Sequence, residues 1–194
     1  FGIFFRFNNN TTERKKIITL SKPEDKIDDL WPFIRKKINE KEQIFWVCPL
    51  IEDSNKLDFS STSKLFKLLN KKFNNKVGII HGALDQNEKE KVLNEFLNNK
   101  ISILVSTTVI EVGIDFPNAT VIVIENANKF GLAQLHQLRG RIGRGAKPGT
   151  CILMFKNQLS QNAKKRIQIL KTSDDGFYIA EEDMKLRGYG DIIG

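Results

Sequence analysis

The sequence predicts an α/β protein with a mainly parallel sheet that is covered by helices on both faces and followed by a C-terminal helical hairpin. The first observation is a series of short apolar runs without polar alternation, as expected of strands buried on both faces. The second is that amphipathic segments separate these runs, which is typical of parallel strands joined by helices. The third is a change after Lys156 to basic amphipathic segments, which predicts the hairpin.

The chain is expected to begin with a linker or fragment end over residues 1–14, because this stretch finishes in the polar, Asn-rich NNNTTER. A short strand should follow at residues 15–20. Ser21, with Pro23 and two carboxylates just after it, predicts the start of a helix, because a cap, an early proline and an acidic first turn stabilise a helix N-terminus. This helix should reach Ile38.

The middle of the chain supplies the remaining strands of the lobe and two of its helices. Apolar runs predict strands at residues 43–51, 77–80, 101–106, 121–125 and 151–155. Thr62 or Ser63 is expected to cap a helix whose apolar positions begin at Leu65. Asp85, with Glu88 three positions later, predicts the next helix start through a capping box.

The length of 194 residues suits one substantial core with a helical appendage. We expect a lobe over residues 15–157 and a hairpin over 158–194, with helices at 160–172 and 176–186. The last residues, RGYGDIIG, stop abruptly, so the hairpin is expected to be incomplete and the chain to be part of a longer protein.

Composition narrows the class of protein. A formal charge of +8 and a pI near 9.5 point to a polyanionic partner such as nucleic acid, although evenly scattered lysine would merely aid solubility. Cys48 and Cys151 lie inside apolar runs, which favours reduced, buried thiols. Neither histidine is near a cysteine in sequence, so no metal site is expected, and no apolar run is long enough to span a membrane.

The stretch from Gly131 to Gly145, GLAQLHQLRGRIGRG, carries three arginines within six positions: Arg139, Arg141 and Arg144. Guanidinium groups so close together repel one another unless a polyanion neutralises them, and their fork geometry suits phosphate. A solvated basic turn is the alternative, and it would be favoured for an arbitrary Arg-Gly stretch. The order of the residues favours a phosphate-facing arginine cluster over a solvated basic turn.

That order resembles the sixth conserved motif of superfamily 2 helicases and translocases. The full string is similar to that of the RecG family and of the transcription-repair coupling translocases, and the resemblance extends from about residue 15 onward. It implies a RecA-like fold, in which ATP lies between two lobes and the first lobe carries the P-loop. No GxxxxGK[ST] occurs in this sequence, so the chain is expected to be the second lobe and to be inactive alone.

The resemblance also assigns residues to the nucleotide. Arg141 and Arg144 would reach the γ-phosphate as the catalytic arginines, with Arg144 favoured as the finger. Gln137 would lie beside them and couple nucleotide state to DNA. The string TTVIEVGIDFP resembles the fifth motif, in which Gly113 and Asp115 would face the nucleotide.

Four residues are assigned to the DNA backbone. Hydroxyls and open amides after a strand can bind phosphate oxygens, and the resemblance gives this role to Thr107 and Thr108; taken alone, the string is as consistent with an ordinary loop. His81 and Gly82 match a position that approaches a DNA phosphate. Because ligands of parallel sheets gather at the carboxyl ends of strands, we expect all of these segments at that edge.

The C-terminal segment resembles the translocation motif of the same family. Arg166 and Arg187 match two arginines that couple lobe closure to movement along DNA, although each could also be an ordinary helix-surface charge. Arg139 is assigned no role, and His136 is expected to be structural.

The resemblance therefore implies an ATP-dependent DNA helicase of the RecG type, which remodels branched DNA and stalled replication forks in repair and recombination. Its cofactors would be ATP and Mg²⁺, held mainly by the missing first lobe. Its partners would be branched or duplex DNA and the first lobe and wedge domain of the same protein. A monomer in the bacterial cytoplasm, without a membrane, is expected.

Two alternatives remain open at this point. A transcription-repair coupling translocase would add RNA polymerase as a partner, although IEVGIDFPNA and GRGAKPGTCILMF are more similar to RecG. A non-catalytic, basic DNA-binding module derived from such a lobe is the second alternative.

Overall fold

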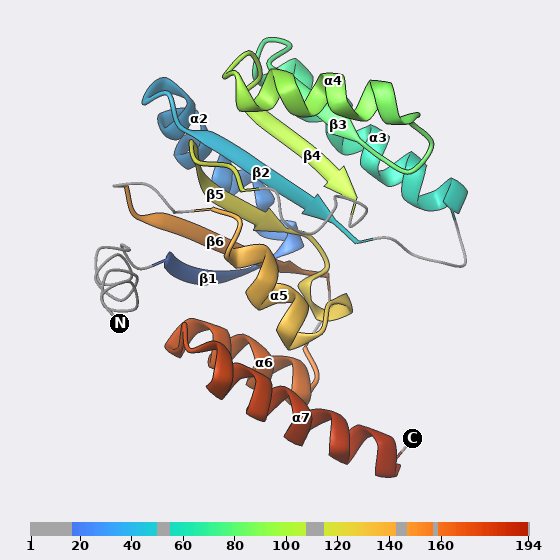
Figure 1. The fold of residues 1–194 in the computed structure, drawn as a ribbon, viewed down its shortest axis with the longest axis vertical. Coiled ribbons are helices and arrows are strands. Elements are labelled where there is room, and N and C mark those ends of the chain that lie inside the picture. The colour runs from blue at the N-terminus through green and yellow to red at the C-terminus, as the bar shows by residue number, and fades with distance from the viewer. Residues whose placement is uncertain (1–16, 50–54, 108–114, 143–146, 157–158, 194) are drawn as a thin grey trace, which may run out of the picture.

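The computed structural model describes residues 17–49, 55–107, 115–142, 147–156 and 159–193 and, within them, all side chains except those of 55–61 and 189–193. Six strands form one sheet in the order β1-β6-β5-β2-β4-β3, and every neighbouring pair is parallel (Figure 1). The strands are β1 (Ile17–Pro23), β2 (Gln43–Cys48), β3 (Val77–Ile80), β4 (Ile103–Thr107), β5 (Ala119–Ile124) and β6 (Gly149–Phe155).

Helices connect these strands and continue beyond them. They are η1 (Glu24–Leu30), α2 (Trp31–Asn39), α3 (Asn55–Lys72), α4 (Gln86–Leu97), η2 (Ala127–Lys129), α5 (Leu132–Arg139), α6 (Gln161–Thr172) and α7 (Gly176–Ile193), of which η1 and η2 are 3₁₀ helices. The last two form the hairpin, which packs below α5 in Figure 1. The predicted fold class, a parallel sheet with helices on both faces and a hairpin after it, is confirmed.

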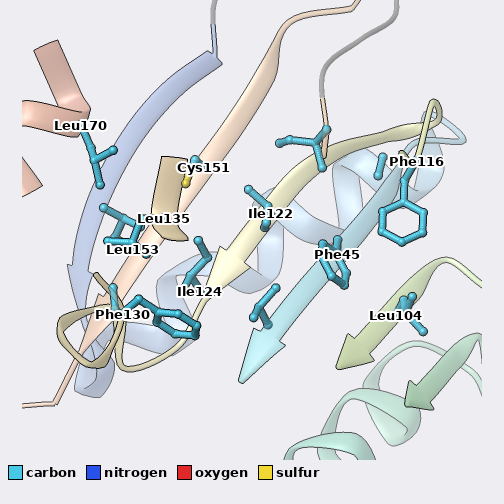
Figure 2. Close-up of a cluster of buried hydrophobic side chains, with 14 of the residues drawn as sticks. Phe45, Leu104, Phe116, Ile122, Ile124, Phe130, Leu135, Cys151, Leu153 and Leu170 are labelled. Carbon is cyan, nitrogen blue, oxygen red and sulfur yellow. The ribbon is translucent and has the colours of Figure 1, made fainter. Parts of the chain in front are cut away.

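Each face of the sheet has its own core. On one face, η1, α2 and α3 bury Trp46 together with Ile34 and Leu69. On the other face, α4, α5 and the hairpin cover a second cluster, part of which Figure 2 shows. Phe116 there contacts Phe45 and Phe96, with ring centroids 5.0 and 5.1 Å apart. This double burial explains why the strands read as continuous apolar runs.

Two predicted helix caps are wrong. Ser21 lies within β1, because the parallel pairing with β6 continues to Pro23 opposite Phe155. Helical structure does begin at Glu24, with Glu24 and Asp25 in its first turn as expected, but as the 3₁₀ helix η1, and α2 follows at Trp31. Thr62 and Ser63 lie inside α3, which begins at Asn55. In both places a residue suited to capping lies within a longer element, where tertiary packing outweighs the local signal.

Two helices begin with a side-chain cap, of which the one at Asp85 is the predicted one. The Asp85 carboxylate accepts a hydrogen bond of 2.8 Å from the Glu88 backbone amide at the start of α4. The Ser160 hydroxyl accepts one of 3.1 Å from the Ala163 amide at the start of α6. Each cap satisfies one of the unpaired N–H groups of a first helical turn.

No helix in the described part of the chain is long and apolar enough to cross a membrane.

Candidate nucleotide and nucleic-acid interface

The arginine segment does not form one phosphate-facing cluster. Arg139, the last residue of α5, is only 2% exposed. Its guanidinium donates hydrogen bonds to the carbonyl oxygens of Leu170 and Ser173 and, at 3.2 Å, to the Thr19 hydroxyl. The expectation that all three arginines form one phosphate-facing cluster is therefore wrong for Arg139, to which the resemblance assigns no role. The physical reason is that this guanidinium satisfies carbonyl groups at the end of α6, which otherwise lack partners.

Arg141, two residues later, lies in a different environment. Its guanidinium Nη1 is 3.6 Å from the Asp115 carboxylate Oδ1, and the Arg141 carbonyl accepts a hydrogen bond of 3.1 Å from the Phe116 amide. The side chains of Arg141 and Asp115 remain 20% and 35% exposed. The structure thus brings together two residues predicted to face the nucleotide, from segments 26 positions apart in sequence.

This pair lies at the amino end of β5, since Asp115 comes just before that strand begins at Ala119. The expectation that it lies at the carboxyl edge is wrong. The chain leaves β4 at the carboxyl edge and must return to the opposite edge before it enters β5, because the strands are parallel. The Arg141–Asp115 pair is therefore about one strand length, roughly 17–20 Å, from the carboxyl edge.

Gln137 is exposed on α5, one helical turn before Arg141. Gln134 has a local task instead, because its side-chain oxygen accepts a hydrogen bond of 2.9 Å from the Gly131 amide at the start of the helix. Three predicted site residues, Thr108, Gly113 and Arg144, lie outside the described residues.

His81 and Gly82 follow β3 at the carboxyl edge, as expected. His81 is partly buried, its Nδ1 accepts a hydrogen bond of 3.2 Å from the Ala83 amide, and burial lowers the pKa of its imidazole. Gly82 is exposed, and a Cβ built on it would meet nothing within 4 Å. No packing within the described lobe requires glycine here, so the backbone at Gly82 is open to the close approach of a ligand.

Thr107 closes β4 at the same edge, but its side chain is enclosed. It is 4% exposed, and its hydroxyl has no hydrogen-bond partner among the described residues. The Thr107 hydroxyl is thus not presented to solvent in this arrangement, and its predicted contact with DNA stays a prediction.

The two predicted coupling arginines converge on the start of α5. Arg166 on α6 donates to the Phe130 carbonyl at 3.4 Å. Arg187 on α7 pairs with Asp183 at 3.3 Å, and its Nη2 is 3.2 Å from the position that a Cβ on Gly131 would occupy. Because Arg139 holds the other end of α5, both ends of this helix are attached to the hairpin.

Glu125 is a candidate functional residue that the sequence reasoning missed. It follows β5 at the carboxyl edge, where its Oε1 accepts a hydrogen bond of 3.2 Å from Trp46 Nε1 and its Oε2 lies 3.9 Å from Cys48 Sγ. Burial, reinforced by the nearby Glu24 carboxylate, raises the pKa of Glu125 to about 7. The sequence signal for Glu125 is that a carboxylate directly follows the apolar run VIVI.

Among the residues that the structure describes, no group of three or more His, Cys, Asp or Glu side chains could hold a metal ion.

A six-stranded parallel sheet with this arginine segment and a hairpin defines a RecA-like helicase C-terminal lobe. The chain belongs to the family described as helicase conserved C-terminal domain, whose model matches residues 25–146. It is 45% identical over 183 residues to the ATP-dependent DNA helicase RecG of Bacillus subtilis (strain 168), covering 93% of this chain and 27% of that protein. For RecG of Thermotoga maritima the identity is also 45%, over 93% of this chain and 23% of the relative.

Solved structures of helicases also match this chain. A structure of RecG bound to a three-way DNA junction matches with a TM-score of 0.77 and 43% identity, over 92% of this chain and 23% of that chain. Yeast Dbp5 bound to RNA and ADP BeF3 matches with a TM-score of 0.61 at 21% identity, which supports the fold alone. The predicted resemblance to RecG is confirmed, and the chain spans about a quarter of the length of these relatives.

Proposed function

We propose that this chain is the second motor lobe of an ATP-dependent DNA helicase of the RecG type, which remodels branched DNA. The observation that carries the proposal is the Arg141–Asp115 pair, which joins two predicted nucleotide-facing segments on one partly exposed surface. The RecG relatives favour this function over transcription-repair coupling. We place the protein in the bacterial cytoplasm, as a monomer that acts on chromosomal DNA at stalled forks during repair and recombination.

The exposed part of this surface fits a nucleotide. A guanidinium can donate two parallel hydrogen bonds to phosphate, and a neighbouring carboxylate can accept hydrogen bonds from ribose hydroxyls. Arg141 and Asp115 supply these groups, and we assign Arg144, Gly113 and Gln137 to the same pocket. ATP, with Mg²⁺ held mainly by the first lobe, supplies the phosphoryl group that is transferred to water.

The contribution of this lobe to hydrolysis is electrostatic. Charge develops on the transferred phosphoryl group, and a guanidinium brought from another lobe stabilises it without having to reorganise. Arg144 would act as the finger, while Arg141 would hold the phosphate. Because the chain contains no P-loop, it needs the first lobe to form a complete pocket.

DNA is assigned to the carboxyl edge of the sheet. Gly82 leaves its backbone open there, and His81 adds a largely neutral ring that can hydrogen-bond to phosphate oxygens. Thr107 closes the adjacent strand β4, Thr108 comes directly after it, and we assign both residues to the DNA backbone. The formal charge of +8 adds a long-range attraction to DNA.

The hairpin would transmit nucleotide state to DNA movement. Helix α5 ends two residues before Arg141, and Arg166, Arg187 and Arg139 attach its two ends to α6, α7 and the turn between them. A shift of Arg141 on nucleotide binding would therefore move the hairpin.

The test is Arg144→Ala in the full-length protein. We expect DNA-stimulated ATPase to fall by about 10³-fold or more, the range for loss of an arginine finger, while the dissociation constant for a three-way junction changes less than about twofold. Lys147→Ala, an exposed cation three positions later, is the matched control and should retain activity. ATPase that survives Arg144→Ala would favour the non-catalytic DNA-binding module.

A further inference from the structure

Glu125 is a half-buried residue whose carboxyl group lies at the edge of the sheet that we assign to DNA. Trp46 Nε1 and Cys48 Sγ approach its two oxygens, at 3.2 and 3.9 Å. Its backbone amide donates a hydrogen bond of 2.9 Å to the Val47 carbonyl, which ties the end of β5 to β2. Nothing in the nucleotide chemistry described above uses this carboxyl group.

Its position relative to Thr107 follows from the register. Cys48 is paired with Thr107 across β2 and β4, so these two side chains leave the same face of the sheet. Since Glu125 reaches Cys48 on that face from β5, the three residues form a row across three adjacent strands. Strands about 4.8 Å apart place Glu125 roughly 10 Å from Thr107.

A carboxyl group in this row can alternate between neutral and charged forms near neutral pH. Burial and the Glu24 carboxylate on η1 raise the pKa of Glu125 to about 7, whereas Lys156 after β6 and the contacts from Trp46 and Cys48 on β2 act in the opposite direction. Below that value the group is mostly neutral, and above it the row acquires a negative charge that repels a phosphate.

We propose that Glu125 is a positioning residue for the DNA contact, and that the lobe holds DNA phosphates more tightly when this carboxyl group is protonated than when it is ionised. The inference rests on the proposed function, because it takes DNA as the ligand of this edge. The carboxyl group acts through its charge at this edge of the sheet and is not itself a DNA ligand. At a separation of roughly 10 Å, one added charge changes affinity by a few-fold, about threefold to fivefold.

The experiment measures the dissociation constant of the full-length protein for a fluorescent three-way junction, without nucleotide, from about pH 6.5 to about pH 8.5 at fixed ionic strength. Glu125→Gln mimics the protonated form. The wild-type protein should lose about threefold to fivefold more affinity over this range than Glu125→Gln. His81 titrates in both proteins, so the difference between the two profiles isolates Glu125. Glu40→Gln, near the opposite edge of the sheet, is the control and should follow the wild type.

Identical profiles for the wild type and Glu125→Gln would overturn the proposal. If near-UV circular dichroism shows that Glu125→Gln is misfolded, Glu24→Gln, a change at the half-buried first residue of η1, provides the test. Loss of the Glu24 charge should move the midpoint of the wild-type profile to lower pH, and an unmoved midpoint would overturn the proposal equally. A full-length protein that binds no junction at any pH would contradict the proposed function instead.

Discussion

Two arginines only two positions apart, Arg139 and Arg141, have different tasks in this lobe. Arg139 is enclosed by β1 and the hairpin and donates to carbonyl oxygens, while Arg141 keeps part of its guanidinium exposed beside Asp115. Which guanidinium meets solvent depends on the segments that approach it in the fold. The spacing of the two arginines in sequence does not predict which guanidinium meets solvent.

The hydrogen bonds that Arg139 donates lead to a prediction about the stability of the lobe. Arg139→Met keeps an unbranched chain but leaves the Leu170 and Ser173 carbonyls and the Thr19 hydroxyl without this donor. We expect the free energy of unfolding of this lobe to fall by about 2–4 kcal/mol, because several buried polar groups lose a charged partner. Urea denaturation measures the change.

Lys171→Met, on the exposed side of α6, serves as the comparison and should change the free energy of unfolding by less than about 0.5 kcal/mol. Equal stabilities for the two variants would show that the buried network around Arg139 is not what holds the hairpin to the lobe.

At the residue scale, motifs in the sequence name part of the candidate site. They name His81, Gly82, Asp115 and Arg141, of which the structure brings the last two together, and the roles of all four stay predictions. Glu125 was missed, because burial of a carboxylate depends on β2 lying beside β5, and strand neighbours far apart in sequence leave no local pattern.

At the scale of elements, local signals located the strands well and the helix starts unevenly. Strands β4 and β5 were predicted because burial on both faces makes every residue apolar. The caps predicted at Ser21 and at Thr62 or Ser63 are wrong, because pairing of β1 with β6 and the packing of the longer helix α3 override capping preferences. The strand order could not be predicted, since it is set by contacts between distant segments.

In the proposed function, the coupling between nucleotide and DNA depends on helix α5. In the full-length protein, Arg166→Ala removes the contact between α6 and the Phe130 carbonyl at the start of this helix. We expect DNA-stimulated ATPase to stay within about threefold of the wild type while junction unwinding falls at least about tenfold, because hydrolysis no longer moves the hairpin. The measurement is the amount of ATP hydrolysed per junction unwound.

Lys165→Ala, an exposed neighbour on α6, should leave that ratio unchanged. A proportional loss of ATPase and unwinding in Arg166→Ala would indicate that Arg166 supports the nucleotide pocket and not its coupling to the hairpin.

At the scale of the whole molecule, the two candidate surfaces lie at opposite ends of the strands. His81 and Thr107 lie at the carboxyl edge, and the Arg141–Asp115 pair lies at the amino end of β5. Helix α5 begins eight residues after β5 ends and finishes two residues before Arg141, so it runs between the two surfaces with the hairpin attached along it (Figure 1). This arrangement would connect the proposed nucleotide surface to the proposed DNA surface within one lobe.

In the proposed function, the Arg141 guanidinium completes a nucleotide pocket that the first lobe begins. The most direct measurement is the DNA-stimulated ATPase of the full-length protein with Arg141→Ala, with junction affinity measured in parallel. We expect a loss of about 10³-fold in ATPase with junction affinity changed less than about threefold, because the lost charge acts on the transferred phosphoryl group and not on DNA. ATPase within a few-fold of the wild type would contradict it.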